Sequence, residues 1–303
     1  MKEIIAYIKT RLTPVYPADE AVALAWWILE ELTGKSRTQL QFDCKDTKNI
    51  PNTQTIDQII ARLLRNEPIQ YIFGHTLWNG LDLLVTPATL IPRPETAELV
   101  ERINTEMNKC ENRQMGKCEN GQMGKCVHVL DIGTGSGCIA IALKKAHPDW
   151  QVTGIDISPE AIEVARQNAI RNHVEVNFRV ADIFSEKESF NFQVSSFNLI
   201  VSNPPYICES EKSSMRPNVL DYEPSSALFV PDADPLRFYR RIAELFSNPQ
   251  TPIPDRLERA LFFEINEAYP AEVSAMLKRL GYTDIHIHND IYGKPRIVQG
   301  RMA

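Results

Sequence analysis

A glycine-rich turn between a strand-like run and a helix-like run constrains the fold of this chain most. The apolar run 127–130 leads into residues 131–137, which read Asp-Ile-Gly-Thr-Gly-Ser-Gly, and an apolar run over 138–143 follows. Strand, glycine turn and helix in this order are typical of nucleotide-binding sheets, in which glycines let the backbone approach a ligand. The spacing is G-x-G-x-G, without a phosphate-loop lysine, so the turn alone is a weak signal.

Two further strand ends reinforce this signal. The run 152–155 ends at Asp156, and a carboxylate at this position can accept hydrogen bonds from both ribose hydroxyls. The alternative is that Asp156 caps the helix expected over 159–172, but Ser158 is the better cap residue. A third strand, expected over 175–180, leads to Asp182 and Ile183, an acid and an apolar side chain suited to an adenine.

The run 197–202 is apolar and ends abruptly in Asn203-Pro204-Pro205-Tyr206. Proline has no N–H, so this corner offers carbonyl oxygens and the Asn203 amide with few competing donors, which suits a planar NH₂ group. These four residues alone are equally compatible with a strand end closed by a proline turn. The glycine turn and Asp156 favour a binding site, because ligands of open parallel sheets lie at the carboxyl ends of the strands.

This constellation resembles the class I S-adenosylmethionine-dependent methyltransferases. Two upstream segments, 67–74 (Glu-Pro-Ile-Gln-Tyr-Ile-Phe-Gly) and 90–96 (Leu-Ile-Pro-Arg-Pro-Glu-Thr), narrow the resemblance to the HemK/PrmC family. That family methylates the glutamine in the Gly-Gly-Gln motif of peptide chain release factors. Downstream segments 223–224, 263–265 and 290–296 also fit, so the similarity spans nearly the whole chain.

The resemblance implies a Rossmann-like seven-stranded sheet with its last strand antiparallel, S-adenosylmethionine as cofactor, and a set of site residues. The catalytic residues are Asn203, Pro204, Pro205 and Tyr206; the cofactor-binding residues are Gly133, Thr134, Gly135, Ser136, Gly137, Asp156, Asp182, Ile183 and Asn203; the substrate pocket holds Arg93, Pro94, Glu95 and Thr96. Asn203 Oδ1 and the Pro204 carbonyl would accept the two N–H bonds of the glutamine, and Tyr206 would pack against its amide. Residues 92–96 also suit a rigid turn before a helix, and both interpretations can hold.

The pattern divides the chain into three parts. Residues 1–68 carry helical apolar stripes and predict a small helical domain. The resemblance implies that this domain recognises the release factor. Residues 69–94 predict a β-hairpin connector with β-prone runs at 70–73 and 81–85. Residues 95–303 form the catalytic domain, with a helix over 95–107 and then a near-exact eight-residue repeat over 109–126, which we expect as a solvated surface insertion. Later strands are expected over 259–265, 283–288 and 296–301, and helices over 236–246 and 271–280.

Composition narrows the class of partner. The chain has 303 residues and a formal net charge of −6, which argues against a dominant nucleic-acid surface. No run is long and apolar enough to span a membrane, and residues 1–3 do not begin a secretory signal, so we expect a cytoplasmic protein. The family resemblance implies a release factor as its partner, and we expect the chain to be a monomer. Cys110, Cys118 and Cys126 recur with the repeat and no C-x-x-C pair occurs, so no metal site is expected.

Three positions depart from the family pattern: Ala97, Asn266 and Asp234 with its following proline. They lie outside the glycine turn and the Asn203 motif, so we expect them to affect only the local shape of loops.

The sequence leaves alternative functions open. They are methylation of a glutamine in a ribosomal protein, methylation of an exocyclic amino group of a DNA base, and a binding module that kept the fold without activity. The intact Asn203 motif disfavours the last.

Overall fold

The structure is a computed structural model that describes residues 1–42, 52–115, 127–185, 194, 197–247 and 259–302. The described residues divide into two compact units. The smaller unit comprises Met1–Gly74 with Arg216–Tyr222, and the larger comprises His75–Met215 with Glu223–Ala303. The three-part division at residues 68 and 94 stays a prediction, although the boundary after Gly74 lies within the segment assigned to the connector.

The smaller unit is helical. Its helices are α1 (Lys2–Leu12), α2 (Ala18–Thr33), α3 (Arg37–Phe42), α4 (Thr53–Leu63), α5 (Ile69–Phe73) and α9 (Pro217–Leu220). The stripes that the sequence marks as apolar form its core, in which Ile8, Ile28 and Ile60 have no exposed surface. The Tyr222 hydroxyl donates to the Arg65 carbonyl at 2.8 Å and fastens the segment 216–222 to this unit.

One expected strand is wrong. Residues 70–73 lie in the short helix α5, which follows Pro68 and ends at Gly74. Tyr and Ile favour strands, but one helical turn buries Ile69 and Tyr71, and that packing decides the conformation. The hairpin follows instead as β1 (His75–Trp78) and β2 (Leu81–Leu84), joined by Asn79-Gly80, the dipeptide that tight hairpin turns favour.

The larger unit contains the predicted sheet. Within the described residues, seven strands pair in the order β10-β11-β9-β6-β3-β4-β5. They are β3 (His128–Ile132), β4 (Gln151–Asp156), β5 (Asn177–Val180), β6 (Leu199–Ser202), β9 (Arg259–Glu264), β10 (Thr283–Asn289) and β11 (Pro295–Met302). β3 pairs in parallel with β4 and β6, and the last strand, β11, is antiparallel to both neighbours. The predicted sheet with a reversed last strand is therefore confirmed.

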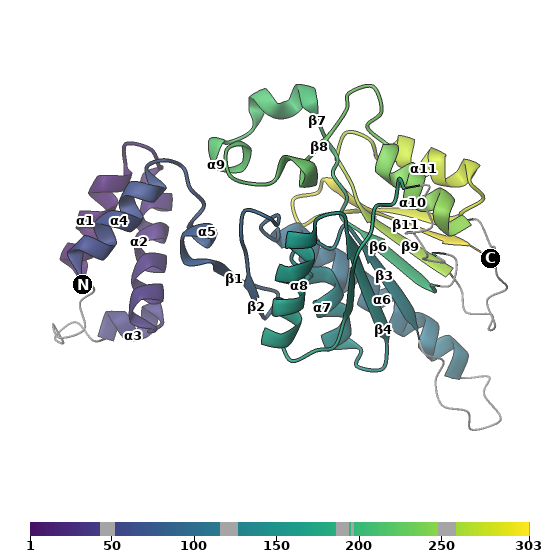
Figure 1. Cartoon of the computed structure of the whole chain (residues 1–303), viewed down its shortest axis with the longest axis horizontal. Coiled ribbons are helices and arrows are strands. Elements are labelled where there is room, and N and C mark those ends of the chain that lie inside the picture. Colours follow the sequence, from purple (N-terminus) through teal and green to yellow (C-terminus); the bar gives the residue numbers. More distant parts are fainter. Residues whose placement is uncertain (43–51, 116–126, 186–193, 195–196, 248–258, 303) are drawn as a thin grey trace. The chain divides into compact units, whose positions relative to one another are not determined.

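Helices cover both faces of this sheet (Figure 1). One apolar core joins the sheet to α6 (Pro94–Met115), α7 (Cys138–Ala146), α8 (Pro159–Arg171) and the hairpin; the other joins it to α10 (Arg237–Ser247) and α11 (Pro270–Arg279). Asn168 of α8 holds the hairpin, since its side chain accepts from Leu84 N at 2.6 Å and donates to Leu84 O at 2.9 Å.

Smaller elements connect the later strands. A two-stranded parallel pair, β7 (Ile207–Cys208) with β8 (Phe229–Val230), follows the Asn203 motif, and the 3₁₀ turns η3 (Glu209–Ser214) and η4 (Ser225–Ala227) lie between its strands. Helix α6 runs to Met115, beyond the expected end at 107, so the backbone of the first repeat copy is helical up to that residue. Residues 116–126, with Cys118 and Cys126, lie outside the described residues, and so does Cys44.

Gly154 of β4 lies directly against the Phe178 ring of β5. A Cβ at this position would lie 2.6 Å from the Phe178 ring and 2.8 Å from Thr134 Oγ1. Phe178 is itself only 5% exposed, so its ring has little room to move. The packing between β4 and β5 therefore requires glycine here.

We expect Gly154→Ala to lower the free energy of unfolding by about 1–3 kcal/mol through overpacking. Urea denaturation followed by circular dichroism measures this change. The double variant Gly154→Ala/Phe178→Leu, which opens space beside the new methyl group, should lose less than the sum of the two single variants. Additive losses would contradict the packing explanation.

Candidate active site

A cavity of about 440 Å³ lies in the larger unit at the carboxyl ends of the parallel strands. Residues 132–136 from the end of β3 line it, with residues 155–158 from the end of β4. Residues 181–184 after β5 and 202–205 at the end of β6 line it as well. The strand ends that the sequence singles out therefore meet at one cavity.

The glycine turn presents its backbone to this cavity. Gly133 and Gly135 both have positive φ, 71° and 52°, and a Cβ on either would meet no atom within 4 Å. Thr134 and Ser136 line the same wall. Gly137 differs: it is not among the lining residues, and a Cβ there would come within 3.0 Å of Phe178 and 3.1 Å of Ala165. The structure thus gives Gly137 a packing role.

Asp156 lies at the cavity wall and is held by the backbone. Its Oδ2 accepts from Gly135 N at 2.9 Å and its Oδ1 accepts from Ser158 N at 3.0 Å. Burial raises the pKa of this carboxyl group. Ser158 caps α8, because its Oγ accepts from Ala161 N at 3.0 Å, so the alternative in which Asp156 is the cap is excluded. A carboxylate has about four acceptor sites, so Asp156 keeps acceptor capacity for a ligand beside these backbone hydrogen bonds.

Asp182 and Ile183 lie on the next wall. Asp182 Oδ1 accepts from Phe184 N at 2.9 Å, which shapes the turn after β5. Arg241 of α10 donates to the Ile183 carbonyl at 2.7 Å and ties that turn to the helix. Phe184 and Phe238 meet edge to face, with ring centroids 5.3 Å apart, and both line the cavity. This wall is largely apolar and aromatic, as a flat heterocycle requires.

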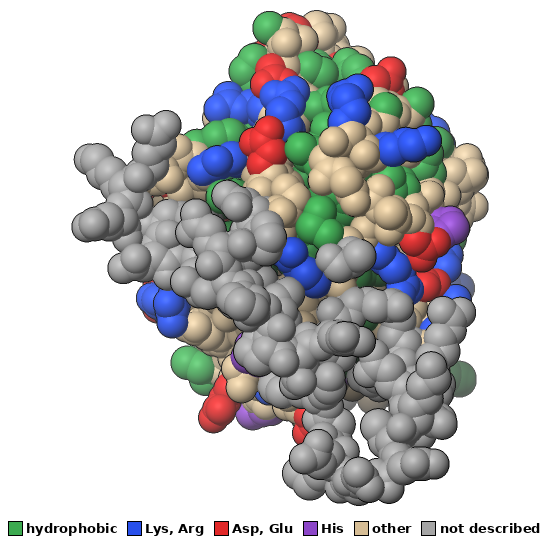
Figure 2. Space-filling view, turned by 90° about the vertical axis from the view of Figure 1, so that its right-hand side faces the viewer, with side chains coloured by type: hydrophobic (Ala, Val, Ile, Leu, Met, Phe, Trp, Pro, Cys, Tyr) green, Lys and Arg blue, Asp and Glu red, His purple; other side chains and the backbone are tan. Residues whose placement is uncertain are grey.

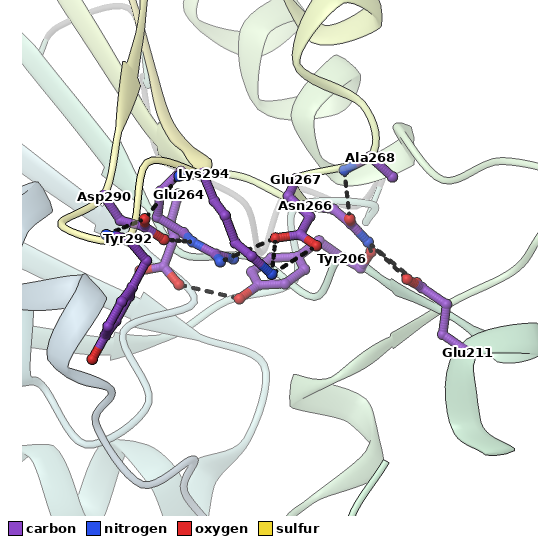
Figure 3. Close-up of polar contacts among 10 residues, drawn as sticks. Tyr206, Glu211, Glu264, Asn266, Glu267, Ala268, Asp290, Tyr292 and Lys294 are labelled. Atoms are coloured by element: carbon purple, nitrogen blue, oxygen red, sulfur yellow. Dashed lines mark hydrogen bonds and ion pairs between the residues drawn. The ribbon is translucent and has the colours of Figure 1, made fainter. Parts of the chain in front are cut away.

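The Asn203 corner lies at the cavity as well. Asn203, Pro204 and Pro205 line it, and Asn203 Nδ2 donates to Thr96 Oγ1 at 3.2 Å. Tyr206 is not among the lining residues. Its hydroxyl points at Glu264 of β9 and donates to Oε1 at 3.2 Å (Figure 3).

Thr96 and Glu264 form a buried pair behind this corner. Thr96 Oγ1 donates to Glu264 Oε2 at 2.7 Å, and the two side chains are 2% and 1% exposed. Burial raises the pKa of Glu264, while the hydrogen bonds from Thr96 and Tyr206 and the nearby Arg296 oppose that rise. Sequence reasoning placed Thr96 in the substrate pocket but gave Glu264 no role beyond a family signature.

The segment 92–96 serves both as a turn and as a cavity wall. Arg93 and Thr96 line the cavity, whereas Pro94 and Glu95 are not among its lining residues and begin α6. Arg93 Nη2 donates to Glu223 Oε1 at 2.6 Å, and Glu223 Oε2 accepts from Ile91 N at 3.1 Å. Glu223 is buried, so this pair fixes the loop before η4 against the segment that holds Arg93.

The departures from the family pattern are accommodated locally. Asn266 donates through Nδ2 to the Tyr206 carbonyl at 3.1 Å and points at Glu211 (Figure 3). Asp234 pairs with Arg240 at 2.8 Å, and Ala97 packs against the core beneath α6. Asn266 thus supports the backbone of the Asn203 motif, a role that the sequence did not indicate.

Known proteins match the chain along nearly its full length. The PrmC N-terminal domain family matches residues 3–74, and a methyltransferase domain family matches residues 124–248. A release factor glutamine methyltransferase of Bacteroides thetaiotaomicron is 43% identical over 98% of this chain and 99% of its own length. One of Flavobacterium psychrophilum is 37% identical over 95% of this chain and 94% of its own length. The chain belongs to the release factor glutamine methyltransferase family.

Solved structures agree on the fold. The catalytic domain of hMettl16, in complex with an RNA hairpin, aligns with a TM-score of 0.50 and 14% identity, covering 74% of this chain and 76% of that one. This likeness concerns the fold alone. The expected assignment to the HemK/PrmC family and to the class I methyltransferase fold is confirmed by the relatives and by the sheet.

Asp131, at the end of β3, is a buried carboxyl group behind the glycine turn. Its Oδ2 accepts from the Thr134 hydroxyl at 2.6 Å and from Ala140 N at 3.2 Å, whereas Oδ1 has no hydrogen-bond partner among the described residues. Burial raises its pKa to about 7. A carboxyl whose folded-state pKa is raised favours folding fully below its unfolded pKa, near 4, and loses that contribution as the pH rises towards 7.

We therefore expect wild type to lose stability relative to Asp131→Asn as the pH rises. Between about pH 5 and about pH 8 the difference in free energy of unfolding should shift in favour of the variant by about 2 kcal/mol. Urea titrations of both proteins at the two pH values give this difference, and changes common to both cancel. A difference that stays constant would show that Asp131 is ionised throughout.

Proposed function

We propose that this chain transfers a methyl group from S-adenosylmethionine to the side-chain amide nitrogen of the glutamine in the Gly-Gly-Gln motif of peptide chain release factors. The family supports the chemistry and the substrate, since the relatives that match over their full length are named release factor glutamine methyltransferases. The observation that carries the proposal is the position of Asn203 and Pro204 on the wall of the cavity formed by the glycine turn and Asp156.

The cavity fits the cofactor in size and in chemistry. Its volume of about 440 Å³ is within the range of small-molecule sites. The open space before Gly133 and Gly135 accommodates a ligand against the backbone, and Asp156 can accept from ribose hydroxyls. Asp182 and Ile183 would hold the adenine. When bound, the cofactor supplies an activated methyl group on a sulfonium sulfur.

Asn203 and Pro204 orient the nitrogen that receives the methyl group. An amide nitrogen is a poor nucleophile because its lone pair is shared with the carbonyl, so positioning is the main task of the protein. Asn203 Oδ1 and the Pro204 carbonyl accept the two N–H bonds of the glutamine, which orients the nitrogen and favours the positive charge that it gains. The nitrogen then loses a proton to water, so no dedicated base is required.

The remaining parts supply recognition. Arg93 and Thr96 line the cavity, and we assign them to its substrate side. We assign recognition of the release factor to residues 1–68, with residues 69–94 as connector and residues 95–303 as catalytic domain. None of the helices that the structure describes is long and apolar enough to cross a bilayer. A monomer acting on a cytoplasmic protein, without direct contact to nucleic acid, completes the proposal.

A ribosomal-protein glutamine and a DNA base remain the competing substrates. On the face drawn in Figure 2, Lys and Arg side chains are interspersed with Asp and Glu in the part that is described, and they do not gather into a basic channel.

A methylation assay identifies the substrate. The protein is incubated with labelled cofactor and, in separate reactions, with release factor, ribosomal protein or DNA, and mass spectrometry then locates the methyl group. Methyl transfer to the glutamine of Gly-Gly-Gln is expected, and labelling of another substrate alone would refute the proposal.

Changing Asn203 to Ala should impair turnover far more than cofactor binding. Loss of a positioned acceptor is expected to lower kcat by about 100-fold or more, because the amide nitrogen is no longer held in line. Affinity for S-adenosylmethionine, measured by calorimetry, should change by less than about three-fold, since Asn203 does not support the ribose wall. Near-normal kcat in this variant would contradict the role given to Asn203.

Asp156→Ala should show the reverse pattern. It removes the carboxylate that accepts from Gly135 and that faces the ribose, so the affinity for S-adenosylmethionine should fall roughly 10- to 100-fold. Turnover at saturating cofactor should fall much less than in Asn203→Ala, because the substrate corner is intact. Calorimetry and steady-state methylation assays together check the contrast; an unchanged cofactor affinity would remove Asp156 from the binding site.

A further inference from the structure

The polarity of the Asn203 amide decides whether the proposed chemistry works. A side-chain amide has an oxygen at one end and an NH₂ group at the other, and the two ends are similar in shape. Only the oxygen can accept a hydrogen bond from the substrate NH₂ group. The NH₂ end would place donor against donor. Some part of the structure must therefore hold the amide with Oδ1 towards the ligand.

Thr96 can hold the Asn203 amide in this orientation because the Thr96 hydroxyl is itself bound to Glu264. Its hydroxyl has a single hydrogen, and that hydrogen is donated to Glu264 Oε2 at 2.7 Å. The same oxygen of Thr96 lies 3.2 Å from Asn203 Nδ2 and can then only accept. Among the described residues, Thr96 is the one hydrogen-bond partner of the Asn203 side chain, so Oδ1 at the opposite end of the amide is left for a ligand.

Glu264 sets the direction of this relay because an ionised carboxylate only accepts. Its other oxygen, Oε1, receives the Tyr206 hydroxyl at 3.2 Å, so both of its neighbours donate to it. If Glu264 were protonated, it could donate to Thr96, and the Thr96 hydroxyl could then turn its hydrogen towards Asn203. The amide would turn over to meet that hydrogen and would present NH₂ to the substrate.

We propose that Glu264 is a positioning residue that acts through Thr96 to fix the Asn203 amide with its oxygen towards the substrate. The inference rests on the proposed function, since it assigns a purpose to the oxygen that accepts from the glutamine. The Glu264 carboxylate does not line the cavity. Its hydrogen bond with Thr96 joins β9 to α6, and the two residues are 168 positions apart in the chain.

A purely structural tie between α6 and β9 makes different predictions. Such a tie would affect stability and the placement of the whole segment from Arg93 to Thr96, where α6 begins, and it would not depend on hydrogen-bond direction. The relay depends on one hydroxyl. Serine in place of Thr96 keeps that hydroxyl, whereas valine keeps the shape of threonine and removes it.

The test compares Thr96→Val with Thr96→Ser in the full chain acting on a release factor. Thr96→Val should lower kcat by about 10- to 100-fold through loss of orientation. In both variants the affinity for S-adenosylmethionine should stay within about two-fold of wild type, because the glycine turn and Asp156 are untouched. Thr96→Ser should keep kcat within about three-fold of wild type. Equal losses in the two variants, or none in Thr96→Val, would overturn the proposal.

The dependence of wild-type kcat on pH gives a second measurement that needs no variant. The titratable and charged groups around Glu264 are Tyr206, Arg296 of β11, Glu95 of α6, Tyr239 of α10 and Cys138 of α7. Burial raises the pKa of Glu264 from its ordinary value. At saturating cofactor, kcat should fall on the acid side as Glu264 takes up a proton. A kcat that stays constant with falling pH until the protein unfolds would also overturn the relay.

These results can be told apart from failure of the proposed function. If wild type does not methylate the release factor, the substrate assignment fails before any variant is compared. If wild type methylates it and Thr96→Val is equally active, the substrate assignment stands and only the relay is lost.

Discussion

The parallel pairing of β3 with β4 on one side and β6 on the other is the constraint on which the site depends. Parallel strands end at the same edge of the sheet, so residues that lie far apart in the chain come close together in space. The glycine turn follows β3, Asp156 is the last residue of β4, and Asn203 follows β6. Close packing beneath that edge, where Gly154 admits the Phe178 ring, keeps the strands in register.

Local patterns in the sequence predicted the strands and turns that end at this edge of the sheet. The apolar runs, the glycine turn and the proline corner mark strand ends by short-range chemistry, and Ser158 marks the start of α8. The strand expected at 70–73 was wrong because burial of Ile69 and Tyr71 in a helical turn outweighed their β propensity. The extension of α6 to Met115 was missed because the polar repeat was expected to form a surface insertion, whereas its backbone continues the helix up to that residue.

Contacts between distant segments could not be read from the sequence. Thr96 and Glu264 are 168 positions apart, and neither carries a local signal that it will meet the other. The same holds for Arg93 with Glu223, and for Asn266, which supports the Tyr206 carbonyl. Gly137 belongs to the expected cofactor pattern, but its place against Phe178 depends on how α7 and α8 pack on the sheet.

A buried carboxylate behind the site is expensive to maintain. Burial disfavours the charged form of Glu264, and two hydroxyl donors with Arg296 nearby offset part of that cost. A neutral residue would fill the same space at a lower desolvation penalty. The relay gives a carboxylate a purpose at this position, because only a group that accepts from both neighbours fixes the direction of the hydrogen bond to Asn203.

The role of Asn203 can be tested by a structure of the protein with the demethylated cofactor product and a Gly-Gly-Gln peptide. We expect the glutamine nitrogen to lie within hydrogen-bonding distance of both Asn203 Oδ1 and the Pro204 carbonyl, with Asn203 Nδ2 still hydrogen-bonded to Thr96. A glutamine bound elsewhere in the cavity, or an Asn203 amide whose nitrogen faces the peptide, would contradict it.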